Sequence, residues 1–273
     1  MDEERPEPEE PPLSTLPPVP PRPDLVSDAW PPFEPSPRRR FPSWVIGSAV
    51  ITIVMMLGAL ATSYVIREDV SGRDEYGFIA RDFRGEPVRW NPCEPVHYVV
   101  NVAAAPEGSL GDVQEAVRRI SAATGITFVY YGLTDEVLER RRPVVQERRY
   151  GDGWAPVLVT WIDPDTSTVS FRSEGDIAAG VASPFTPPGA DVIVSGWIAI
   201  NADDPNPPGF GSPDDQGPVV LHEWGHVMGL DHVEERGQLM HPAGGGVSDL
   251  GLGDREGLRR LGRSEGCLTT PVP

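Results

Sequence analysis

The chain has 273 residues, of which 32 are proline, and its formal net charge at pH 7 is -18. All 23 basic residues are arginine, and the acidic excess leaves no basic surface of the kind that binds nucleic acid. Nucleic acid is therefore excluded as a partner, and the length predicts one folded domain with appendages.

The first 43 residues form an acidic, proline-rich segment. Pairs such as Pro11-Pro12 and Pro17-Pro18 stand among Glu and Asp, a composition that buries too little apolar surface to offset chain entropy. Residues 1–43 are therefore predicted to be a disordered tail, partly polyproline II, with no assigned function. A docking motif for a proline-recognising partner is the alternative.

Residues 44–66 are apolar and carry no charge. At about 1.5 Å per residue, a helix of this length crosses a hydrocarbon core of about 30 Å, so the segment predicts a transmembrane helix in contact with membrane lipid. The cluster Arg38-Arg39-Arg40 before it predicts a cytoplasmic N-terminus and an extracellular domain. A cleaved signal peptide is the alternative, because Ala59-Leu60-Ala61 resembles a processing site, and cleavage near Ala61 would secrete the domain.

Residues 67–86 are charged and lack sustained periodicity, which predicts a juxtamembrane linker. The folded domain is expected at residues 87–268, with a short C-terminal tail at 269–273. Cys93 and Cys267 lie near the two ends of this domain and are candidates for a disulfide. Such a bridge would stabilise the fold by up to about 5 kcal/mol in an oxidising compartment. Two unrelated buried thiols are the alternative.

The hydrophobic pattern of the domain indicates an α+β or α/β sheet fold. The predicted strands, rich in branched and aromatic residues, cover residues 96–102, 126–131, 157–162 and 192–200. Apolar residues at helical spacing predict an amphipathic helix from Leu110 that ends at Gly125. A last helix is expected at 254–262. Residues 139–150 contain five arginines and are predicted to be a solvated loop, with binding of an acidic partner as the alternative.

Three of the five histidines fall within eleven residues, His222-Glu223-Trp224-Gly225-His226-Val227-Met228-Gly229-Leu230-Asp231-His232. On a helix, the i, i+4 spacing of His222 and His226 places both imidazoles on one face. A catalytic zinc ion needs three protein ligands and an open position. Gly229 can adopt the left-handed conformation that ends a helix and lets His232 turn back as the third ligand.

Glu223 stands one position after the first histidine, beside the metal-facing side of the helix. From there its carboxylate can reach a zinc-activated water without binding the metal. Glu223 is therefore the candidate general base for hydrolysis of a peptide bond.

This segment resembles the signature His-Glu-x-x-His-x-x-Gly-x-x-His of the metzincin metallopeptidases. Met240 in Gln238-Leu239-Met240-His241-Pro242 is similar to the methionine turn of that family. The order of elements from about residue 90 to 261 is similar to the matrixin branch. The resemblance implies an α+β fold with a mixed twisted sheet, an N-terminal helix, a zinc helix and a C-terminal helix. It also implies protein or peptide substrates, and an apolar floor under the zinc formed by Met240.

Several features depart from the matrixin pattern. No cysteine stands in a propeptide position, and Val233 follows the third histidine where vertebrate matrixins have serine. Only His97 and His241 remain outside the motif, so one zinc ion is expected, and these two are predicted to be ordinary packed or exposed side chains. Calcium, which matrixins bind, is a further hypothesis. The oxygen-rich turns that would hold it contain Asp163, Asp165, Asp203 and Asp204.

The sequence thus predicts a membrane-anchored zinc metalloendopeptidase that uses Glu223 as general base. By resemblance, the substrate strand would pair with a sheet edge near residues 178–183. The alternative is a catalytically silent binding module on a metzincin scaffold, but such descendants usually lose the glutamate or a ligand, and both are present in this chain.

Overall fold

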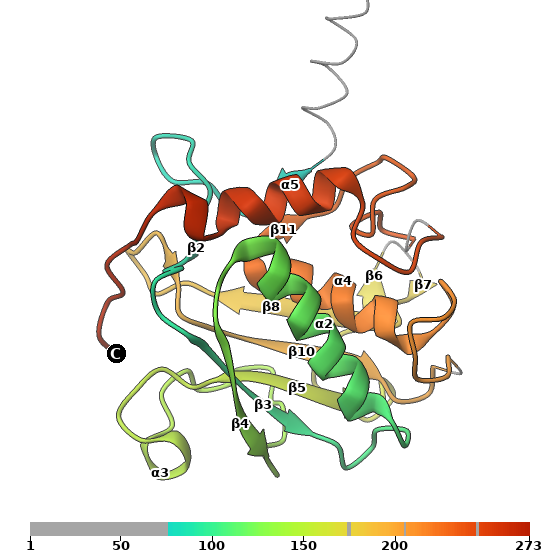
Figure 1. Ribbon diagram of the computed structural model, residues 1–273. Helices are drawn as coiled ribbons and strands as arrows, with labels where there is room; N and C mark the ends of the chain where they lie inside the picture. Colours follow the sequence, from blue (N-terminus) through green and yellow to red (C-terminus); the bar gives the residue numbers. More distant parts are fainter. Residues whose placement is uncertain (1–75, 174–175, 205, 244–245) are drawn as a thin grey trace, which may run out of the picture. The chain divides into compact units, whose positions relative to one another are not determined.

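A computed structural model describes residues 76–173, 176–204, 206–243 and 246–273 (Figure 1). Within these ranges the chain forms an α+β domain built on a five-stranded mixed sheet. The strands of this sheet are β3 (Val96–Asn101), β4 (Phe128–Leu133), β5 (Val157–Ile162), β8 (Gly180–Phe185) and β10 (Ser195–Asn201). The helices are α2 (Ser109–Thr124), α3 (Glu147–Tyr150), α4 (Gln216–Met228), α5 (Leu252–Leu261) and the 3-10 helix η1 (Arg263–Glu265).

The fold predicted from the sequence requires one correction. Among the described residues, no helix has the length and apolar character needed to cross a membrane. The α+β sheet domain is present, but the transmembrane helix predicted for 44–66 is not part of the described fold. Those residues lie outside the described ranges, as do the predicted tail at 1–43 and residues 67–75 of the predicted linker.

The strand order of the central sheet is β4-β3-β5-β10-β8. The pairs β4–β3, β3–β5 and β5–β10 are parallel, whereas β8 pairs antiparallel with β10, from Gly180 opposite Ile200 to Phe185 opposite Ser195. β8 is therefore an antiparallel edge strand on an otherwise parallel sheet. Short two-stranded pairs accompany it, formed by β2 (Arg89–Trp90) with β9 (Val192–Ile193) and by β6 (Arg172–Ser173) with β7 (Asp176–Ile177).

The central strands are apolar on both faces because both faces are covered. In β5, Val157 and Val159 join the main core, while Leu158 joins a second cluster with Val99 and Ala199. Helices α2 and α4 pack together and lie over the same face of the sheet (Figure 1). The main core between these helices and the strands supports the site described below.

Helix α2 confirms the predicted amphipathic pattern. Its residues Val113, Ala116, Val117 and Ile120 are buried at the i, i+3, i+4, i+7 spacing of one helical face. The helix ends where Gly125 takes a left-handed φ of 70° and donates its N–H to Ser121.

The folded domain extends beyond the predicted boundaries at both ends. β1 (Gly77–Phe78), which lies within the predicted linker, pairs antiparallel with β11 (Leu230–Asp231) and so belongs to the folded domain. At the other end, Trp154 Nε1 donates to the carbonyl oxygen of Pro271 at 2.8 Å. The predicted disulfide between Cys93 and Cys267 is confirmed and joins two positions 174 residues apart.

The arginine-rich segment at 139–150 is only partly the solvated loop that its composition predicts. The side chain of Arg142 is 3% exposed and forms an ion pair of 2.7 Å with Glu136. It also donates to the backbone oxygens of Gly196 and Pro156. One arginine of the five therefore ties this loop to the sheet.

Candidate metal centre

Helix α4 carries the first two histidines of the motif and is fixed to the sheet by Trp224. The Trp224 indole is fully buried and packs edge-on against the rings of Tyr98 and Phe128. His222 and His226 lie on another side of the same helix and are half-buried. The deep anchor thus holds the backbone from which both imidazoles project.

The predicted turn at Gly229 is present. α4 ends at Met228, and Gly229 adopts a left-handed φ of 113° while its N–H caps carbonyl oxygens of the last turn. The chain then reverses into β11, which delivers His232, an exposed residue, to the side of α4 that carries His222 and His226. A side chain at position 229 would be strained, and its Cβ would also lie 3.1 Å from the Val88 carbonyl oxygen.

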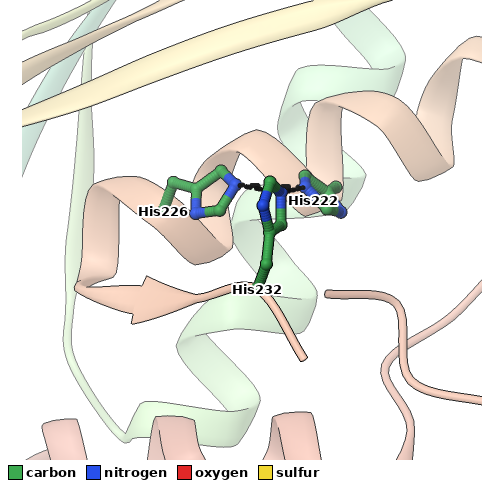
Figure 2. A group of neighbouring side chains, drawn as sticks. All are labelled: His222, His226 and His232. Carbon is green, nitrogen blue, oxygen red and sulfur yellow. Dashed lines mark hydrogen bonds between the residues drawn. The ribbon is translucent and has the colours of Figure 1, made fainter. Parts of the chain in front are cut away.

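The three histidines converge on one point, as Figure 2 shows. The Nε2 atoms of His222, His226 and His232 are separated pairwise by 3.1 Å, which makes an equilateral triangle. Among the described residues, these three form the group of metal-ligating side chains close enough to share one ion.

The hydrogen bonds made by the Nδ1 atoms of His222 and His226 show that the Nε2 atoms of these two rings carry no proton. His222 Nδ1 lies 2.7 Å from the Leu239 carbonyl oxygen, and His226 Nδ1 lies 2.8 Å from that of Leu230. A carbonyl oxygen can only accept, so both Nδ1 atoms must donate. Burial lowers the pKa of His222 to about 3 and that of His226 to about 4, so both rings are neutral near pH 7. Their single proton is then on Nδ1, and each Nε2 presents a lone pair to the other.

This arrangement fits a zinc ion. Without a cation, two lone pairs held 3.1 Å apart repel each other, whereas a shared cation makes the same spacing favourable. Tetrahedral zinc with Zn–N bonds of about 2.0–2.1 Å requires nitrogen atoms about 3.3 Å apart. The backbone carbonyls that accept from Nδ1 are the outer partners that usually orient metal-binding imidazoles.

Glu223, the residue that follows His222 in the chain, carries a buried carboxyl group. It is 4% exposed, and its Oε2 has no hydrogen-bond partner. Burial raises the pKa of the carboxyl group to about 8. A carboxyl group in this state is unfavourable for stability and is typical of a group retained for chemistry. A nearby cation would favour its ionised form.

Met240 lies in the core next to α4. It is 1% exposed, and a Cβ built on Gly225 would lie 2.5 Å from its Sδ. Gly225, between the two helical histidines, therefore leaves the space into which the methionine packs. The sequence alone offered no signal for this role, because Gly225 occupies a variable position of the motif.

The turn that contains Met240 is held by Asp254 on α5. The Asp254 carboxylate accepts from the backbone N–H of Leu239 at 2.6 Å and of Met240 at 3.3 Å. Its own N–H donates to Gln238 Oε1 at 3.1 Å. Since Leu239 supplies the carbonyl oxygen that orients His222, Asp254 supports the metal centre through one intermediate residue. Its acidic position in the first turn of the last helix was visible in the sequence, but its contact with the turn was not.

The two remaining histidines and the aspartates considered for calcium do not join the three converging histidines. His97 on β3 stacks on Tyr131 with ring centroids 4.3 Å apart, and His241 Nδ1 accepts from Ala243 at 3.1 Å. Asp163 and Asp204 accept from backbone N–H groups two residues further along the chain, as in ordinary Asx turns. No described acidic residue joins a group of three potential ligands, so the calcium hypothesis gains no support.

A cavity in the described part of the chain is separate from the metal centre. This cavity of about 330 Å³ is lined by aromatic residues that include Trp90, Tyr131, Tyr150 and Trp154, together with His97. None of the three converging histidines lines it, and it contains no comparable set of metal ligands. The candidate chemistry therefore belongs to the open surface around His232.

No protein-family model matches the chain, and no curated protein matches it either. The fold and the histidine geometry are therefore the basis for the functional proposal that follows.

Proposed function

We propose that this protein is a zinc-dependent metalloendopeptidase of the metzincin type. The observation that carries the proposal is the combination of three Nε2 atoms 3.1 Å apart with an adjacent, buried and unpaired glutamate. His222, His226 and His232 would hold the ion. Zinc, when bound, would supply a Lewis acid that lowers the pKa of water and polarises the scissile carbonyl.

Glu223 acts as the general base in this proposal. Its carboxylate accepts a proton from the attacking water and then delivers it to the leaving amine, so that the C–N bond of the peptide is hydrolysed. The unpaired Oε2 supports this role, because an oxygen already engaged by protein donors would be a weaker base.

Strand β8 would bind the substrate backbone. It forms one edge of the central sheet, and its first residue, Gly180, contacts the Glu223 side chain. An extended peptide added to this edge would therefore run close to the general base. Residues 180–183 of this edge strand fall within the segment 178–183 that the sequence proposes for substrate pairing.

Metal analysis and a cleavage assay on the full-length chain test the proposal together. The expected result is one zinc per chain and cleavage of a denatured protein that stops on chelation and returns with added zinc. Zinc binding without any cleavage would instead support the silent binding module. Failure to bind zinc would overturn both.

A further inference from the structure

We propose that Gly180 is a positioning residue for Glu223, an inference that rests on the proposed function. Gly180 begins the edge strand β8 and is buried. A Cβ built at this position would lie 2.8 Å from Glu223 Cγ, 2.9 Å from Oε1 and 3.1 Å from Cδ. The three atoms nearest to that Cβ all belong to Glu223, so the glutamate occupies the space that any other residue at 180 would fill.

The requirement for glycine at this position is one of space and not of backbone conformation. Gly180 does not have a positive φ, so its backbone can accept alanine without strain. In contrast, Gly229 needs its left-handed φ to turn the chain toward His232. A single methyl group at 180 therefore perturbs Glu223 selectively and leaves the strand intact.

The contact determines where the carboxyl group lies. Glu223 has neither a hydrogen bond to Oε2 nor an ion pair to fix its position, so packing confines the side chain, and the space left by Gly180 is part of that packing. A displacement of about 1 Å in a reacting group can lower the rate about 100-fold. A methyl group that approaches three Glu223 atoms this closely requires a shift in that side chain.

The test compares Gly180→Ala with Gly111→Ala in the full-length, zinc-loaded protein. Gly111 is exposed in α2, lacks a positive φ, and a Cβ there would meet no atom within 4 Å. Gly180→Ala is expected to lower kcat about 100-fold, with KM and zinc content close to those of the parent protein. Gly111→Ala is expected to leave all three unchanged. An unchanged kcat in Gly180→Ala would overturn the inference.

Substitution of Glu223 distinguishes this inference from failure of the proposed function. In a Glu223→Asp background the shorter side chain leaves room for a methyl group at 180. Adding Gly180→Ala to that background should therefore lower kcat far less than 100-fold. An equal loss of kcat in both backgrounds would contradict the inference. If the parent protein cleaves nothing, the proposed function fails. The Tm values of the variants then still test whether residue 180 packs against Glu223. Gly180→Ala should then lower Tm, or prevent folding, only while Glu223 is present, and Glu223→Ala should remove the effect. An effect that persists in Glu223→Ala would overturn the inference.

Discussion

Glu223 and Glu136 are buried to nearly the same extent, with 4% and 5% of their surface exposed. Every carboxylate oxygen of Glu136 is paired, because it accepts from Arg142, Tyr150 and Gln146. Burial alone would raise its pKa, but these hydrogen bonds and the Arg142 charge outweigh burial and lower it. Glu223 has no such donors, and burial raises its pKa to about 8.

The two glutamates show that burial of an acid does not by itself identify a functional group. Glu136 joins the loop after β4 to the sheet through Arg142, and its satisfied oxygens have little capacity left for chemistry. Glu223 directly follows His222 in the chain, and its Oε2 has no hydrogen-bond partner. Substitution of Glu223 should therefore lower activity, whereas substitution of Glu136 should lower stability.

The largest effect is expected for His226→Ala. Two imidazoles do not provide the three protein ligands of a catalytic zinc site, so zinc binding and peptide cleavage should both be lost. Zinc content and cleavage rate, measured on the same sample, check this. Retention of tightly bound zinc with normal cleavage would show that the ion is held elsewhere.

Glu136→Gln should show the opposite behaviour. Removing the charge leaves Arg142 buried without its counter-ion, which is expected to lower the free energy of unfolding by about 3–5 kcal/mol. Denaturant unfolding measures this loss, while zinc content and kcat of the folded fraction should be unchanged. Glu256→Gln is the matched control, because its ion pair with Arg259 is exposed and should contribute less than about 1 kcal/mol.

Asp254→Asn should have a smaller effect that reaches the metal centre indirectly. The substitution weakens the hydrogen bonds that fix Leu239, whose carbonyl oxygen orients His222. Loss of such outer support typically lowers metal affinity about 10- to 100-fold. Competition with a zinc chelator measures the change, and an unaltered affinity would show that the turn keeps its position without this carboxylate.

The smallest expected effect is the loss of the stabilising contribution of Glu136 in acid. Since the folded-state pKa of Glu136 is lowered, its stabilising contribution is present above its ordinary pKa of 4.5 and is lost as pH falls through the lowered value. The difference in unfolding free energy between the parent protein and Glu136→Gln should therefore shrink as pH falls below 4.5. Unfolding curves at a series of acidic pH values measure this, and a constant difference would contradict the assigned cause.

Local patterns predicted much of the fold, whereas long-range contacts were not readable. Strand β5 was predicted with its observed bounds, and α2 starts one residue before its prediction and ends at the predicted glycine, because periodicity and the glycine stop are local signals. The pairing of β1 with β11 joins segments more than 150 residues apart, so the sequence around residue 77 gave no sign that it belonged to the fold. The transmembrane prediction concerns residues outside the described ranges.

In the candidate site, too, the residues fixed by local sequence were predictable and those brought in by long-range contacts were not. His222, His226, Gly229 and His232 could be identified because one helical turn and one reversal fix their geometry. Gly180 and Asp254 contact the site from β8 and α5, and only the packing of those elements against α4 and the methionine turn reveals them. Arg142 was misjudged for a related reason, since its buried partner Glu136 lies outside the arginine-rich run.

The role of Glu223 as general base is tested most directly by the cleavage rate of Glu223→Ala at zinc content equal to that of the parent protein. The three histidines remain, so zinc should still bind, while the loss of the general base should lower kcat about 100- to 10,000-fold. Removal of an unpaired buried carboxyl should also leave the unfolding free energy unchanged or raise it. Cleavage at the parental rate by a zinc-loaded Glu223→Ala protein would contradict the account.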